Sequence, residues 1–150
     1  MPKESAAAAG RSPVGTTPSE EMYLITAAMA EEEGREGPLP LASLAQALSI
    51  SPVSANQMVR RLADRGLFEY HPYHGVVLTA RGRIAARRVL RGRRLWAGFL
   101  VDHLGFDMDE ADELACEFEH VTPPLLADRL EVFMRRSGSG AGTERDGDRR

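Results

Sequence analysis

Apolar side chains recur every three to four residues along much of this chain, a period that predicts amphipathic helices. We expect helices over residues 19–33, 41–48 and 52–64. Ser51 is placed to cap the third of them, with Pro52 at its first position. The short connection between the second and third helices is typical of a helix-turn-helix.

Further along the chain the hydrophobic period changes to that of strands and then back to that of helices. Residues 67–71 and 76–79 are rich in strand formers and flank a Pro/Gly turn, so we predict a β-hairpin, or wing, after the helix-turn-helix. A long helix over residues 80–104 follows. Two more helices are predicted, over residues 109–121 and 122–133. The expected fold is therefore mainly α with one small hairpin.

Length and composition allow one compact core or two small subdomains. The 150 residues are 43% hydrophobic, but residues 1–17 and 137–150 lack apolar periodicity, so we expect both tails to be disordered. No secretory leader is visible, and no apolar run reaches the roughly 18 residues that a membrane span needs. A single cysteine cannot form an internal disulfide, so we expect a cytoplasmic protein in a reducing compartment.

The net charge of −3 is distributed unevenly along the chain. Residues 60–94 hold ten arginines and two acidic residues, whereas residues 101–121 hold eight acidic residues and no lysine or arginine. This pattern favours a protein with a DNA-binding basic part and a cation-binding acidic part. The alternative is that both parts are solvated helix faces of opposite charge.

The second helix of a helix-turn-helix places its early exposed residues in the major groove of DNA. There Asn and Gln can bond base edges, and Ser can bond bases or phosphates. Two arginines lie one turn further on, where we expect phosphates, and the wing tip can reach the backbone or the minor groove. The predicted DNA-contacting residues are Ser51, Ser54, Asn56, Gln57, Arg60, Arg61, Tyr73 and His74. The alternative for each is an ordinary polar surface residue.

A thiol, a carboxylate and an imidazole follow one another at helical spacing in the acidic part. Cys116, Glu119 and His120 stand at positions i, i+3 and i+4 of a predicted helix, so they share one face within about 6 Å. Together they supply three of the four ligands of a borderline-soft metal site. One alternative is a buried Cys, a surface Glu and a core His that share a face by chance. A metalloenzyme is another, but the sequence shows no substrate pocket or general base beside the trio.

With these motifs in place, the chain resembles the diphtheria toxin repressor family of metal-dependent regulators, including its manganese-responsive branch. The resemblance covers residues 18–135 and is carried by Glu21-Met22-Tyr23-Leu24, Glu31-Glu32-Glu33-Gly34, the helix-turn-helix over residues 44–67, Leu78-Thr79-Ala80-Arg81-Gly82 and Ala115-Cys116-Glu117-Phe118-Glu119-His120-Val121. It implies a winged helix-turn-helix over residues 18–80, followed by an all-helical dimerisation and metal-binding domain over residues 81–136.

The resemblance also implies a ligand set. In the family, a Met at the start of the first helix joins the Cys, Glu and His of the later motif in binding a divalent metal. The matching residues here are Met22, Cys116, Glu119 and His120. Thioether and thiolate are soft donors, which favours Fe²⁺ as the cofactor, with Mn²⁺ as the alternative.

At a second family metal site this chain departs from the pattern. Arg93, Ala97 and Asp112 replace its His and Glu ligands, and Ile25 replaces the first-helix Glu of the manganese-type centre. We hypothesise that the Arg93 guanidinium takes the place of the second metal and pairs with Asp112 or Glu119. The alternative is an exposed arginine on a basic helix.

The function implied by the resemblance is a homodimeric repressor of metal-homeostasis genes that binds double-stranded operator DNA when loaded with metal. We expect no enzymatic activity, no membrane partner and no small organic substrate. The alternative function is a dimeric winged-helix DNA-binding protein without metal control, which a chelator-insensitive DNA-binding assay would reveal.

Overall fold

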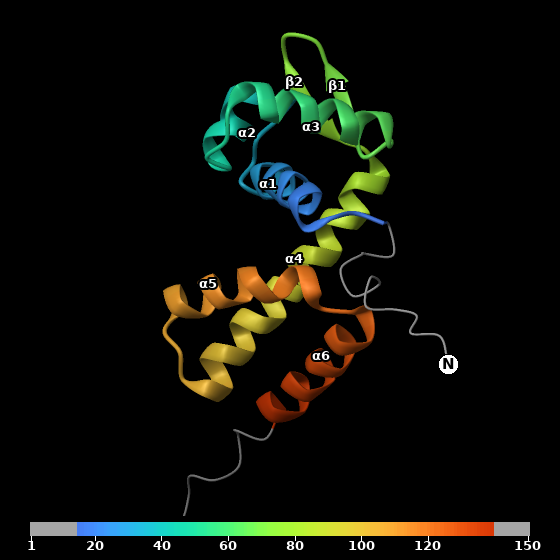
Figure 1. Ribbon diagram of the computed structural model, residues 1–150. Helices are drawn as coiled ribbons and strands as arrows, with labels where there is room; N and C mark the ends of the chain where they lie inside the picture. Colours follow the sequence, from blue (N-terminus) through green and yellow to red (C-terminus); the bar gives the residue numbers. More distant parts are fainter. Residues whose placement is uncertain (1–14, 140–150) are drawn as a thin grey trace, which may run out of the picture. The chain divides into compact units, whose positions relative to one another are not determined.

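The computed structural model describes residues 15–139 (Figure 1). These residues divide into two compact units, with the boundary between Arg91 and Gly92. Most of the tails predicted to be disordered lies outside the described residues. Their inner ends were predicted wrongly, because Thr17 caps a helix and the last helix continues to Ser139.

The first unit is a winged helix-turn-helix, as the sequence predicts. Its elements are α1 (Pro18–Glu32), α2 (Leu41–Ala47), α3 (Pro52–Asp64), β1 (Phe68–His71), β2 (Gly75–Leu78) and the first part of α4 (Ala80–Leu104). The two strands pair antiparallel, with Phe68 opposite Leu78 and His71 opposite Gly75. Apolar residues from every one of these elements form one buried core, which holds α3 against the wing.

Local sequence signals set the helix ends of this unit. Thr17 and Glu20 form a reciprocal capping box at the start of α1, and the Ser51 hydroxyl accepts from the Ser54 N–H at the start of α3. Thr79 does the same for α4 through the Gly82 N–H. Each cap satisfies a backbone donor that the first helical turn leaves free.

The second unit is all-helical. After the second part of α4 come α5 (Met108–Phe118), a short 3₁₀ turn η1 (Glu119–Val121) and α6 (Pro124–Ser139). The prediction of one continuous helix over residues 109–121 is therefore wrong, since α5 ends at Phe118. The cause is the Pro123-Pro124 pair, which cannot continue a helix and forces Thr122 into an extended conformation.

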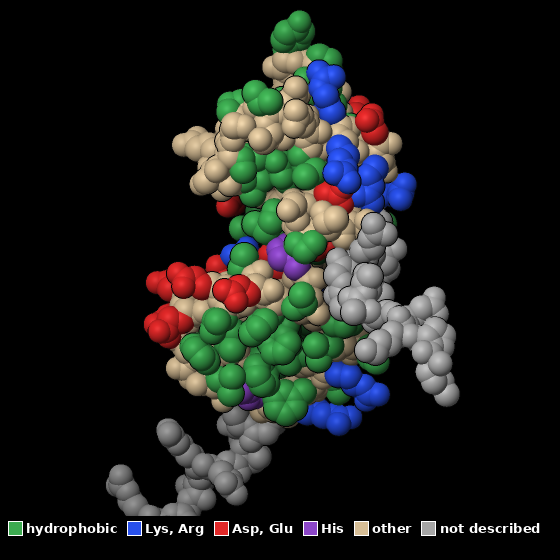
Figure 2. Space-filling model, in the orientation of Figure 1, with side chains coloured by type: hydrophobic (Ala, Val, Ile, Leu, Met, Phe, Trp, Pro, Cys, Tyr) green, Lys and Arg blue, Asp and Glu red, His purple; other side chains and the backbone are tan. Residues whose placement is uncertain are grey.

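A broad hydrophobic patch covers one face of the second unit (Figure 2). The exposed large apolar side chains of this unit are Leu104, Met108, Val121, Leu125, Leu126, Val132 and Phe133. An exposed patch of this kind is typical of a protein-binding surface. None of the helices within residues 15–139 combines the length and apolarity needed to cross a membrane.

Candidate metal centre and nucleic-acid interface

The three predicted metal ligands of the second unit lie together around one carboxylate. Cys116 Sγ donates to Glu119 Oε1 at 3.7 Å, and His120 Nε2 lies 3.2 Å from the same oxygen. Cys116 comes from the last turn of α5, while Glu119 and His120 come from η1. The predicted proximity of the trio is confirmed, although the tighter 3₁₀ turn and not a longer α-helix produces it.

The Glu119 carboxylate is buried, with 3% of the residue exposed. Within residues 15–139 its Oε2 atom accepts no hydrogen bond and has Arg93 Nε at 3.9 Å as its ion-pair partner. Burying a carboxylate oxygen without a hydrogen bond is costly, so this atom favours a cation beside it. The carboxylate, thiol and imidazole of the trio form a donor set that fits a transition metal.

The trio is not arranged as a complete coordination shell. Across the described part of the chain, no group of three or more His, Cys, Asp or Glu side chains is ready to hold a metal ion as it stands. Burial raises the pKa of the Cys116 thiol, and the Glu119 charge raises it further. The thiol therefore keeps its proton at neutral pH, and a metal that binds it must displace that proton.

Arg93 of α4 is bound to Asp112 of α5 by a bidentate ion pair. Its Nε and Nη2 atoms donate to the two Asp112 carboxylate oxygens at 3.0 and 2.6 Å. These hydrogen bonds lower the pKa of Asp112, and they raise that of Arg93. The predicted pairing of Arg93 with Asp112 is confirmed, and the 3.9 Å approach to Glu119 places the same cation next to the trio.

Two consecutive hydrogen bonds that the sequence did not reveal support η1. The Trp96 indole N–H donates to Thr122 Oγ1 at 2.7 Å, and that hydroxyl donates to the Phe118 carbonyl at 2.6 Å. The Trp96 ring also packs on Phe118, with 5.1 Å between ring centroids. Trp96 of α4 thus holds both ends of the turn that carries Glu119 and His120.

Met22, the fourth predicted ligand, lies in the first unit. It is half-buried near the start of α1 and packs against the core of that unit. The other three predicted ligands belong to the second unit. The assignment of all four to one metal remains a prediction.

The predicted DNA-contacting residues lie on α3 and at the tip of the wing. Gln57, Arg60 and Arg61 are exposed on α3, and Tyr73 and His74 are exposed between the two strands. The three remaining candidates, Ser51, Ser54 and Asn56, differ in availability. Asn56 is half-buried, and the Ser51 hydroxyl caps α3 and donates to the Ser54 hydroxyl at 2.9 Å. DNA contact by each of them remains a prediction.

A buried carboxylate, missed by the sequence analysis, joins α1 to the end of α3. Arg65 Nη1 donates to Glu20 Oε2 at 2.6 Å, and Arg61 Nε lies 3.4 Å from Glu20 Oε1. Burial opposes ionisation of Glu20, but hydrogen bonds from the Thr17 N–H and Arg65 outweigh it and lower its pKa. The T-x-x-E signature of Thr17 to Glu20 could have indicated the cap, though not the distant arginine.

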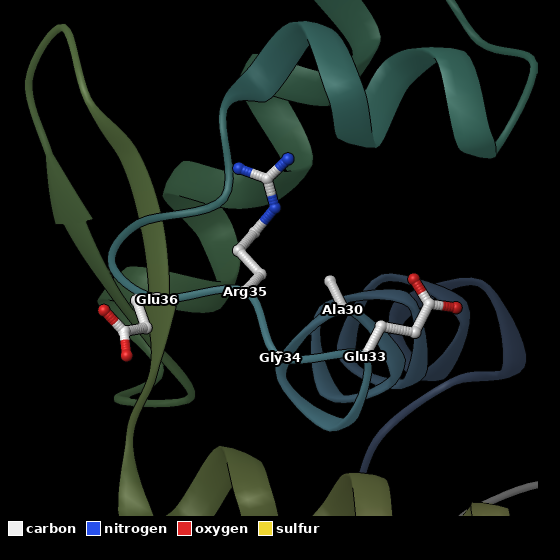
Figure 3. Close-up of a pocket in the computed structure, with 5 residues that line it drawn as sticks. All are labelled: Ala30, Glu33, Gly34, Arg35 and Glu36. Atoms are coloured by element: carbon white, nitrogen blue, oxygen red, sulfur yellow. The ribbon is translucent and has the colours of Figure 1, made fainter.

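A hollow of about 480 Å³ on the first unit, beside the end of α1, is lined by Ala30, Glu33, Gly34, Arg35 and Glu36 (Figure 3). In that view the charged side chains of Glu33, Arg35 and Glu36 point in three different directions. They do not converge on a common point, so this hollow supplies no ligand site of its own.

These features define a winged-helix DNA-binding protein with a separate helical unit that carries a cluster of Cys, Glu and His side chains. Residues 15–76 match the profile of the iron dependent repressor N-terminal DNA binding domain, and residues 79–138 match that of the iron dependent repressor metal binding and dimerisation domain. The chain belongs to the iron-dependent repressor family, which includes the diphtheria toxin repressor. The predicted resemblance and fold class are confirmed.

The chain is similar to several known members of this family. An uncharacterized HTH-type transcriptional regulator of Methanocaldococcus jannaschii is 34% identical over 99 residues, which are 66% of this chain and 79% of the relative. The diphtheria toxin repressor of Corynebacterium efficiens is 36% identical over 111 residues, 73% of this chain and 47% of that protein, so the chain spans about half its length. A manganese-dependent transcriptional repressor in complex with manganese has a TM-score of 0.70 at 31% identity, over 77% of this chain and 52% of that structure.

Proposed function

We propose that this protein is a metal-activated transcriptional repressor that binds double-stranded operator DNA in the cytoplasm as a homodimer. The observation that carries the proposal is the convergence of Cys116 and His120 on the buried Glu119 carboxylate, within a unit that matches a metal binding and dimerisation domain. The winged helix supplies the DNA-binding surface. The exposed hydrophobic patch of the second unit supplies a surface for the second copy.

The proposed ligands are Met22, Cys116, Glu119 and His120. A metal bound to all four would connect the first helix to the helical unit. It could thereby control the orientation in which the winged helix meets DNA. Sulfur donors favour Fe²⁺ over Mn²⁺. The manganese complex among the similar structures keeps Mn²⁺ as the alternative.

The test is a titration of operator binding, on the promoter of the protein's own operon, with Fe²⁺, Mn²⁺, Zn²⁺ or chelator and with oxygen excluded. Control by metal through coupling of the usual roughly 1–3 kcal/mol predicts about 5- to 150-fold tighter binding with the activating metal than with chelator. Equal affinity in chelator and in excess metal would instead support the alternative function, a winged-helix protein without metal control.

Substitutions in α3 should separate base reading from phosphate binding. Gln57→Ala is expected to weaken operator binding by about 1–3 kcal/mol per half-site and to relax sequence preference, because an amide bonds base edges. Arg60→Ala should weaken operator and random DNA alike and flatten the salt dependence. Both affinities are measured over a series of salt concentrations.

The contrast between the two α3 variants decides the assignment. Arg60→Ala serves as the matched control, since Arg60 is also exposed on the same helix. Equal losses on operator and random DNA for Gln57→Ala would remove Gln57 from the base-reading class.

We also propose that Arg93 replaces a second metal ion in this chain. Its guanidinium carries a permanent charge, binds Asp112 with two hydrogen bonds and lies 3.9 Å from Glu119 Oε2. It thereby provides the positive charge that a second metal would bring, without any metal. A second cation at this position would be repelled by the arginine.

One metal ion per protomer is therefore the expected stoichiometry. An anaerobic metal count on purified protein should give one ion for the wild type and for Arg93→Ala, and none for His120→Ala. Two tightly bound ions per wild-type protomer would contradict the replacement.

Removing the support of η1 should weaken metal binding without removing a ligand. Trp96→Phe keeps a ring against Phe118 but loses the N–H donated to Thr122. Loss of an outer hydrogen bond around a metal site typically costs about 10- to 100-fold in metal affinity. Isothermal titration calorimetry measures the metal affinity of the variant. Phe99→Leu is the control, because it changes a ring next to Trp96 and leaves the Trp96–Thr122 hydrogen bond in place.

A further inference from the structure

One arginine of the recognition helix is held by side chains from two different elements. Arg60 Nε donates to Asn56 Oδ1, one helical turn earlier on α3, at 3.3 Å. The guanidinium carbon of Arg60 lies 5.3 Å from the centroid of the Tyr70 ring, which belongs to wing strand β1. That distance lies within the range of a cation–π interaction.

These two contacts fix the direction of a side chain that would otherwise be mobile. Arginine has only donors, so the amide oxygen of Asn56 faces it, and the guanidinium carbon lies over the Tyr70 ring. Among the described residues, neither Nη1 nor Nη2 of Arg60 has a hydrogen-bond partner, and the side chain is exposed. Two terminal nitrogens are therefore left available in a fixed orientation.

We propose that Tyr70 is a positioning residue that, together with Asn56, holds Arg60 as a two-nitrogen fork for a phosphate of the DNA backbone. A planar fork matches the bidentate geometry of phosphate oxygens. Arg60 lies about one helical turn after Asn56 and Gln57, the residues predicted to bond base edges. At that position we expect the phosphate backbone of the duplex. The inference rests on the proposed DNA-binding function and assigns to a wing residue a role exerted through Arg60.

Preorganisation has a measurable consequence. A free arginine loses much of its rotamer freedom when it binds a phosphate, whereas one already held by a ring and an amide loses less. Removing the ring should weaken binding to any DNA sequence, because a phosphate contact carries no sequence information. The effect should also disappear when the arginine itself is absent.

The experiment uses the metal-loaded full-length protein with operator and random duplexes over a series of salt concentrations. Tyr70→Leu should weaken binding to both duplexes by about 2- to 5-fold per protomer, the fold-change that an exposed cation–π contact is worth. Tyr70→Phe, which keeps the ring, should stay within about twofold of the wild type. Adding Tyr70→Leu to Arg60→Ala should cause no further loss, and Arg60→Ala should lower the salt slope by about one per protomer.

Arg60→Lys tests the same idea at an exposed position where folding is not at stake. It keeps the charge but loses the planar fork and the Nε donor, so it should weaken both duplexes about as much as Tyr70→Leu does. Wild-type affinity for Arg60→Lys, or an undiminished loss from Tyr70→Leu in the Arg60→Ala background, would overturn the positioning role. A loss confined to the operator would overturn the phosphate assignment. A wild type that binds neither duplex overturns the proposed function and this inference with it.

Discussion

Replacing Cys116, Glu119 or His120 by alanine is expected to abolish the tightening of operator binding by metal, a loss of about 5- to 150-fold at saturating metal. The three side chains meet at one carboxylate oxygen, so each removal breaks the same cluster. Affinity in chelator should stay at the wild-type level, because the winged helix has its own core. Operator affinity with and without metal, measured for each variant, checks the expectation.

Glu117→Ala is the matched control for the ligand variants. Glu117 lies beside Cys116 on α5 but is exposed, so its removal changes local charge without changing the cluster. It should keep the full metal response. Circular dichroism spectra of all four variants should match the wild type, since the proposed role of the three residues is to bind a metal. A ligand variant that retains the wild-type metal response would remove that residue from the site.

Alanine at Gly82 is expected to destabilise the first unit by about 3 kcal/mol, the upper end of the usual cost of overpacking. A Cβ there would lie 2.0 Å from the Leu67 carbonyl oxygen. That oxygen cannot move aside easily, because it accepts from both the N–H and the hydroxyl of Thr79. Helix propensity alone predicts the opposite effect, because alanine in a helix stabilises the folded state by about 1 kcal/mol relative to glycine.

Thermal or urea unfolding followed by circular dichroism shows whether Gly82→Ala destabilises or stabilises the first unit. For a unit of this size, 3 kcal/mol corresponds to a Tm lower by roughly 12–24 °C. Gly138→Ala is the control, because Gly138 is also helical and a Cβ there meets nothing within 4 Å. It should leave stability unchanged or raise it. An unchanged or higher Tm for Gly82→Ala would show that the Leu67 carbonyl moves away from the added Cβ at little cost in stability.

Much of the fold could be predicted because its signals are local. Ser51 and Thr79 cap helices where the sequence places them, and the strand period with its Pro/Gly turn correctly indicates the wing. The end of α5 was missed although its cause is also local. Helical spacing alone suggested continuation to Val121, whereas Pro123 and Pro124 stop the helix three residues earlier.

The candidate site was predictable only in part. Spacing of i, i+3 and i+4 brought Cys116, Glu119 and His120 together correctly, since neighbours on one helical turn are close in either an α or a 3₁₀ geometry. Pairing of Arg93 with Asp112 was inferred through the resemblance, because opposite charges replaced two ligands of one site. The support from Trp96 had no such signal.

The sequence by itself determined the helix-turn-helix, the caps at Ser51 and Thr79, the wing and the family, because each depends on period, spacing or residue type within short segments. Only the tertiary structure decided which side chains from distant elements meet. Glu20 binds Arg65 across 45 residues of chain, Tyr70 of β1 lies beneath Arg60 of α3, and Trp96 of α4 donates to Thr122 after η1. Such contacts arise from how the cores pack, and packing is a property of the whole fold that no local pattern records.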